Sequence, residues 1–162
     1  MHIVSRRRTV SLPERLEGTN FCLVHLGETK DLRQYQFKHP ARPVATPGKV
    51  FLQELLGLTG MEISFGLLSP GKSMPFHHKH RSNEEVYLFL RGEGHFQIDG
   101  QVHDVREGTA VRVSPDGVRS WRNHSTEDLF FVCIQAKAGS IEGGTTTDGV
   151  GVPGPVQWPE EA

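Results

Sequence analysis

The chain has 162 residues, a length typical of one domain built around one hydrophobic core. Hydrophobic residues make up 36% of it and charged residues 23%, which indicates a soluble globular protein and excludes a disordered or fibrous one. Lys and Arg (18) nearly balance Asp and Glu (19), so a net charge of −1 gives no broad field for nucleic acid or anionic lipid, and we expect neither nucleic acid nor a membrane as a partner.

The first 49 residues predict a strand and an irregular arm rather than a separate domain. Arg6–Arg8 are basic, but residues 9–14 contain no apolar run, so we expect no secretion signal and a cytoplasmic location. An apolar segment at 21–26 predicts a strand. Residues 27–49 are polar and interrupted by prolines, which indicates an irregular arm that packs on the rest of the domain.

Short apolar runs separated by glycine and proline fill the middle of the chain and predict an all-β domain over 50–139. The predicted strands are 50–56, 62–68, 74–80, 85–90, 95–98, 102–105, 110–113, 118–123 and 129–135. Asp99-Gly100 predicts a two-residue type I′ hairpin, because both positions of that turn need a positive φ. No segment sustains a helical period, and strands at this spacing favour a sandwich, jelly roll or barrel.

The composition changes after the last predicted strand. Residues 140–162 are rich in glycine, threonine and proline and predict an extended or mobile tail.

Cys22 and Cys133 lie far apart in the sequence and belong to no Cys-x-x-Cys pair, so we interpret both as buried free thiols.

Histidines crowd the predicted strand 74–80, where side chains alternate between the two faces. His78 and His80 therefore share one face, and a hairpin through 81–83 returns the carboxylate of Glu85 towards them. Two imidazoles and one carboxylate form a ligand set that suits one divalent transition metal, Fe, Mn, Ni or Zn, and leaves coordination positions open. The alternative is a polar hairpin that carries surface histidines.

The same residues resemble the first sequence signature of the cupin superfamily. Gly71, His78-x-His80, Glu85 and Gly92 follow its order and spacing, with one extra residue between Gly71 and the histidines. The resemblance implies a single cupin barrel, that is a double-stranded β-helix or jelly roll, with a metal in its mouth. It also implies frequent dimerisation, and with the apolar segments before residue 60 it predicts a homodimer.

A second segment resembles the other cupin signature, with two departures. Gly108, Pro115, Gly117 and Asn123 follow that signature with one residue added before Pro115, and Ser120 occupies the place where the family usually has its last histidine ligand. A neutral hydroxyl is a weak ligand, so Ser120 is expected to face a coordinated water or the substrate. Either His124 or water would complete the metal shell.

Strand alternation also predicts the wall of the pocket. Tyr87 and Phe89 share parity with Glu85 and should point inward, with Phe76 joining them, and Tyr87 is the residue expected to move a proton. Core packing explains the aromatic residues almost as well. Arg122 shares parity with Ser120 and is the arginine expected to bind a substrate acid group, whereas Arg119 is expected on the solvated surface.

Two kinds of function remain open at this stage. The first is a metal-binding barrel that takes a sugar, sugar phosphate or carboxylate and catalyses an isomerisation or a metal-dependent oxygenation, as the cupin resemblance implies for a sugar-phosphate isomerase or dioxygenase. The second is a non-catalytic module that binds or senses the same small molecule. Fold does not decide between them.

Overall fold

The structure is a computed structural model that describes residues 13–39, 45–143 and 147–159. Arg6–Arg8, on which the argument about secretion depends, lie outside these residues. No helix in the described ranges is long and apolar enough to cross a bilayer.

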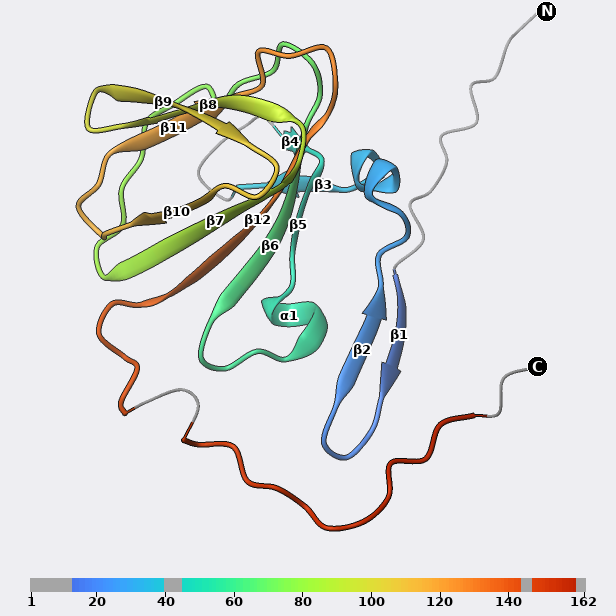
Figure 1. The fold of residues 1–162 in the computed structure, drawn as a ribbon. Coiled ribbons are helices and arrows are strands. Elements are labelled where there is room, and N and C mark those ends of the chain that lie inside the picture. The colour runs from blue at the N-terminus through green and yellow to red at the C-terminus, as the bar shows by residue number, and fades with distance from the viewer. Residues whose placement is uncertain (1–12, 40–44, 144–146, 160–162) are drawn as a thin grey trace, which may run out of the picture.

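Two antiparallel sheets face each other and form the barrel (Figure 1). The larger sheet has the strand order β10-β7-β12-β6-β5, and the smaller has the order β11-β8-β9. Their strands are β5 (Lys49–Phe51), β6 (Glu62–Leu68), β7 (Asn83–Arg91), β8 (Glu93–Ile98), β9 (Gln101–Arg106), β10 (Ala110–Val113), β11 (Arg119–Arg122) and β12 (Leu129–Lys137). The predicted all-β jelly-roll fold is confirmed.

The space between the two sheets is filled by the first of two hydrophobic clusters. Its buried members are Leu68, Tyr87, Phe89, Phe96, Val105, Val113, Trp121, Leu129, Phe131 and Cys133. Phe96 and Trp121 stack with ring centroids 5.9 Å apart, since β8 and β11 pair them directly. These side chains pack one half of the barrel interior. The other half is open at the mouth of the barrel.

The N-terminal segment packs against the larger sheet in two places. Its elements are β1 (Glu14–Glu17), β2 (Cys22–His25), the 3₁₀ helix η1 (Thr29–Gln34), β3 (Gln36–Lys38) and β4 (Ala45–Pro47). β3 and β4 lie at the interior cavity, which Phe37 and Thr46 line, whereas η1 covers the outer face of the sheet. Leu32 of η1 packs with Phe130 and Val132 of β12 in the second hydrophobic cluster. Because alternate residues of β12 are covered on opposite faces, the whole run from Leu129 to Cys133 is buried and apolar.

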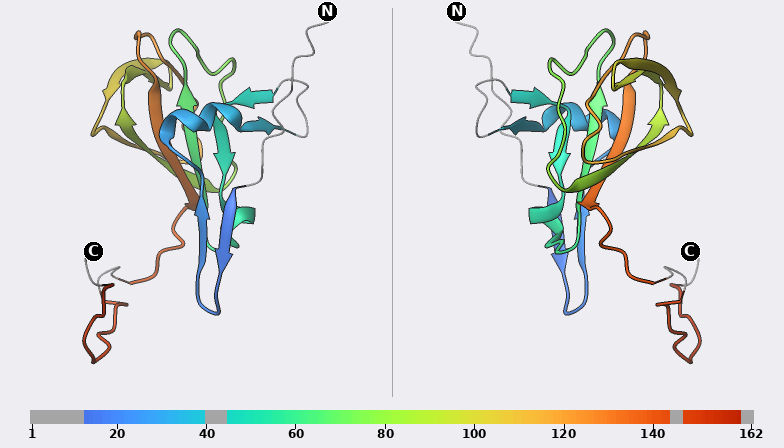
Figure 2. Two further views of the ribbon diagram at one scale, coloured as in Figure 1. Left: turned by 90° about the vertical axis from the view of Figure 1, so that its right-hand side faces the viewer. Right: turned by 90° about the vertical axis from the view of Figure 1, so that its left-hand side faces the viewer.

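The β1–β2 hairpin projects from this N-terminal layer (Figure 2). It leaves Leu16, Phe21 and Leu23 exposed, with 57%, 57% and 40% of their surface accessible. The homodimer stays a prediction, and this hairpin is one of the exposed apolar surfaces of the described residues.

Several sequence predictions need correction in detail. The predicted strand 50–56 is instead β5 followed by the short helix α1 (Gln53–Leu56), which Gly57 ends in the left-handed conformation. Residues 74–80 form no strand but a loop held by isolated bridges, one of them between His78 and Arg119. The arm 27–49 contains η1, β3, β4 and the first residue of β5 rather than being irregular.

The predicted type I′ hairpin is confirmed. Asp99 and Gly100 join β8 to β9 with φ angles of 49° and 84°, as a type I′ turn requires. Cys22 and Cys133 are free thiols as predicted, but only Cys133 is buried, and Cys22 is partly exposed. The described tail residues 140–143 and 147–159 carry no strand or helix and run away from the barrel (Figure 1).

Candidate metal centre and cavity

His78, His80 and Glu85 meet at the open mouth of the barrel. Their ligand atoms all lie within 4.8 Å of one another. The backbone NH of His78 donates to the carbonyl of Arg119, and that of His80 donates to the carbonyl of Pro115, so the histidine loop is held against β11 and the turn before it. Glu85 lies near the start of β7. The structure therefore brings together the three predicted ligands.

Glu85 is the centre of a buried hydrogen-bond network. The Tyr87 hydroxyl donates to its Oε2 at 2.6 Å, and His80 Nε2 lies 2.9 Å from its Oε1. Arg119 donates to Oε2 through Nη2. Burial alone would raise the pKa of Glu85, but the Tyr87 hydrogen bond and the Arg119 guanidinium more than offset it and hold the pKa below its usual value. Glu85 is thus a carboxylate, available as a ligand through Oε1.

Arg119 corrects the sequence interpretation of β11. It was expected on the solvated surface, but its side chain is fully buried (0% exposed) and forms an ion pair with Glu85. The reason is that the interior takes the large Trp121, which pairs with Phe96, so the odd-numbered residues of β11 point inward. Alternation counted from Trp121 instead of Ser120 would have found Arg119.

His78 has the properties of a neutral ligand. Burial and the nearby Arg119 lower its pKa to about 4, so the imidazole is uncharged at neutral pH. Its Nδ1 is buried and has no hydrogen-bond partner among the described residues. Two further buried and unpartnered atoms, Arg119 Nε and Trp121 Nε1, belong to neighbouring side chains. A neutral imidazole lacking one partner, beside a second imidazole and a carboxylate, fits a divalent transition metal.

Tyr87 lies beside the three ligands, and its hydroxyl donates a hydrogen bond to Glu85. Burial, followed by the charges around it, raises its pKa well above the usual value, so the phenol stays protonated as a donor. Cys133 contacts the other carboxylate oxygen, with Sγ 3.5 Å from Oε1, and burial together with Glu85 raises its pKa to about 12. Both groups therefore position the carboxylate of Glu85.

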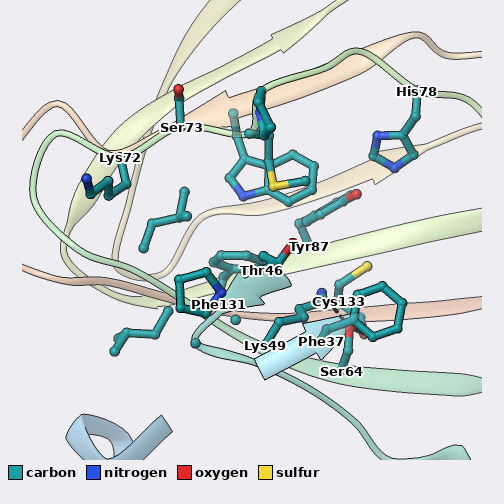
Figure 3. A pocket seen from close by; sticks show the side chains of 18 of the residues that line it. Phe37, Thr46, Lys49, Ser64, Lys72, Ser73, His78, Tyr87, Phe131 and Cys133 are labelled. Atoms are coloured by element: carbon teal, nitrogen blue, oxygen red, sulfur yellow. Dashed lines mark hydrogen bonds between the residues drawn. The ribbon is translucent and has the colours of Figure 1, made fainter. Parts of the chain in front are cut away.

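The site opens into a cavity of about 960 Å³. Figure 3 shows part of its lining, with His78 and Lys72 at opposite sides of the view and Lys49, Ser64 and Cys133 together below. Most of the lining is apolar, and its charged side chains are Arg33, Lys49, Lys72, Lys79 and Glu85. A cavity of this size accommodates a small organic molecule next to the three ligands.

The predicted aromatic wall is divided between the cavity and the core. Phe76 lines the cavity, and its ring packs edge-on against His78 with centroids 5.7 Å apart. Tyr87 lines it too. Phe89 does not: it is fully buried and packs against Phe96 and Phe131 in the core. Its inward direction follows the predicted alternation, but it lies deeper in the barrel than the cavity reaches.

Ser120, Arg122 and His124 do not reach the cavity. The Ser120 hydroxyl donates to the carbonyl of Met74 at 3.3 Å. Arg122 is exposed and donates to His95 Nδ1, and His124 stacks on the His95 ring with centroids 3.9 Å apart. These three positions follow from the inward direction of Trp121, which turns its neighbours outward, so His124 does not complete the metal shell.

Lys49 is a cavity residue that sequence analysis missed. It precedes the predicted start of its strand and stands in no recognisable motif. Its place is set by the pairing of β5 with β6, in which it faces Gly66. No signal in the sequence identifies that partner, because strand pairing is a tertiary property.

Comparison with known proteins agrees with this architecture. A family model described as a cupin domain matches residues 65–135. A cupin protein from Bacteroides fragilis is 41% identical, with a TM-score of 0.63 over 73% of this chain and 98% of its own. A provisionally assigned sugar phosphate isomerase from Acidithiobacillus ferrooxidans is 24% identical over 63% and 66% of the two chains (TM-score 0.53) and is similar in fold. No match was found among curated proteins.

Proposed function

The chain belongs to the cupin family, and we propose that its barrel mouth holds one divalent metal ion on His78, His80 and Glu85. We propose further that the barrel binds a small carboxylate or phosphate compound beside this ion. The observation that supports the proposal is the position of this ligand set at the wall of a 960 Å³ cavity whose charges are mostly positive. Sugar phosphates and sugar acids belong to this class of ligand.

The charge balance of the cavity favours an anion. Glu85, the one carboxylate among the described residues of the lining, is already paired with Arg119. Arg33 and Lys79 pair with Asp128 and Asp116. Among the described residues, Lys49 and Lys72 have no carboxylate within 4.0 Å. A metal ion would add positive charge, so the cavity attracts anions.

The residues around the metal position have separate tasks. Arg119 and Tyr87 hold Oε2 of Glu85, which directs Oε1 towards His80. The buried Arg119 charge also opposes a nearby cation, so we expect weaker metal binding than in a site without it. When bound, the metal would polarise an oxygen atom of the ligand as a Lewis acid. Phe76 and Trp121 shield one side of the cavity from water.

Metal content tests the proposal. Protein purified without immobilised metal should contain about one divalent ion per chain, and His78→Ala should bind that ion at least about tenfold more weakly. His77→Ala is the matched control, because His77 is exposed and bonds Gln97 instead of the site. Equal metal content in the two variants, or none in the wild type, would contradict the proposal.

Ligand binding is tested separately by thermal unfolding of the metal-loaded protein. Small sugar phosphates and sugar acids should raise the unfolding temperature, and the neutral parent sugars should not. Lys72→Ala should reduce the effect, while Lys30→Ala, a change at a lysine outside the cavity, should not. A response to neutral sugars alone would overturn the choice of an anionic ligand.

An enzyme is the second candidate function. It is favoured by the three-ligand set, which leaves coordination positions for a substrate at the wall of the cavity. Isomerase or oxygenase turnover would have to disappear on chelation and return with one preferred metal. Ligand-induced stabilisation without turnover by any metal-loaded form would favour the binding module.

A further inference from the structure

Lys49 occupies a distinct position on the inner face of the larger sheet. Its Nζ donates to Ser64 Oγ at 2.8 Å and lies over the rings of Phe51 and Phe131, at 5.0 and 5.5 Å from their centroids (Figure 3). Gly66, which faces Lys49, leaves room for Phe131: a Cβ there would come within 2.3 Å of that ring. The amine is thus held at an apolar wall of the cavity.

This amine has no ionic partner. Within the described ranges no carboxylate lies within 4.0 Å of Nζ, and its one side-chain hydrogen bond goes to the neutral hydroxyl of Ser64. Lys49 is only partly exposed, and an ammonium group that loses much of its water without gaining a counter-ion is costly. The more distant Glu85, Cys133 and Glu62 favour the charged form, but burial outweighs them and lowers the pKa of Lys49.

The other nucleophilic groups of the same wall are shifted in the opposite direction. Burial raises the pKa of the Cys133 thiol to about 12 and that of the Tyr87 phenol well above its usual value. Both therefore stay protonated and unreactive at neutral pH. Of these three groups, only the amine of Lys49 is moved towards its nucleophilic form.

We propose that Lys49 forms an imine with a small aldehyde or ketone that enters the cavity. The inference deepens the proposed function, since it adds a carbonyl group to the class of small acids, as in an oxo acid or an open-chain sugar acid. The Nζ lone pair adds to the carbonyl carbon while a proton moves from nitrogen to oxygen. The resulting carbinolamine then loses water to give the C=N bond, and no oxidant or reductant is consumed.

Reductive trapping tests this inference. The full chain is incubated with glyoxylate and cyanoborohydride, which reduces an imine to a stable secondary amine, and the modified lysine is located by peptide mass spectrometry. Lys49 should be labelled at least several-fold faster than Lys30 and Lys79, because burial lowers its pKa and so raises the fraction of free amine at neutral pH. Lys30 and Lys79 are exposed and paired with carboxylates.

Variants separate this inference from the metal proposal. Lys49→Arg keeps the charge and should abolish the fast adduct, whereas Lys30→Arg, a matched change at a lysine outside the cavity, should leave it unchanged. Chelated wild type should still form the adduct, so a failure of metal binding leaves this result intact. Circular dichroism checks that each variant is folded. Labelling of exposed lysines with Lys49 unmodified in the folded wild type would overturn the inference.

Discussion

β7 passes through both halves of the barrel interior, and its inward side chains differ between them. Glu85 lies at the mouth, where its charge is balanced by Arg119, while Phe89 lies in the packed half among Phe96 and Phe131. The two residues are four positions apart on one strand and both are buried. Tyr87 joins the halves, since its ring packs on Phe96 and its hydroxyl bonds Glu85.

The difference shows two ways of burying a side chain. In the packed half, burial is favourable by itself because it removes apolar surface from water. At the mouth, burial of Glu85 is unfavourable by itself and is made tolerable by ion pairing and hydrogen bonds. The packed half should therefore be insensitive to pH and metal, and the mouth should depend on both.

The largest effect should come from the packed half. Phe89→Ala should lower the free energy of unfolding by about 4 kcal/mol, because it removes a fully buried ring and leaves a cavity. Urea unfolding at several pH values, with and without divalent metal, would measure it. If the loss of unfolding free energy in Phe89→Ala changed strongly with metal, the packed half would not be independent of the metal site.

Removing the counter-ion at the mouth should have the next largest effect. Arg119→Met should cost about 3 kcal/mol without metal, because it leaves the Glu85 carboxylate buried and uncompensated. Divalent metal should recover part of the loss by supplying positive charge. Urea unfolding in chelator and in Zn²⁺ would show both effects.

Arg122→Met is the matched control for that measurement. Arg122 lies on the same strand but is exposed and bonds His95, so its loss should change stability by no more than about 0.5 kcal/mol. Equal losses of unfolding free energy in Arg119→Met and Arg122→Met would show that the Arg119–Glu85 ion pair does not stabilise the fold more than an exposed arginine does.

A smaller effect should appear on acidification in chelator. The pKa of His78 falls from 6.5 to about 4 on folding, so the unfolded chain takes up its proton first, and stability is lost as pH decreases from about 6.5 to about 4. We expect this one group to contribute about 2 kcal/mol over that range, allowing for its partial exposure. His78→Gln should flatten the slope in this window, whereas His77→Gln should not. An unchanged slope in His78→Gln would contradict the assignment.

Local patterns predicted much of this molecule. The close spacing of His78, His80 and Glu85 and its resemblance to the cupin signature found the three predicted ligands, although 74–80 is a loop and not the strand on which alternation was counted. The Asp-Gly turn located the β8–β9 hairpin. The prediction was wrong for β11, where alternation was counted from Ser120 rather than from Trp121. A one-residue shift of this kind exchanges every inward and outward side chain, so Arg119 was expected outside and Arg122 inside.

The sequence by itself determined the all-β character, the turns and the grouping of His78, His80 and Glu85, because these depend on residues close together in the chain. The tertiary structure decided which arginine faces Glu85, that Phe89 belongs to the core, and that Lys49 lies at the cavity wall. Those positions depend on pairings between distant strands, such as β11 with β8 and β5 with β6. Packing of large side chains such as Trp121 sets these registers, and alternation within β11 gives the inward face only after it is known that Trp121 points inward.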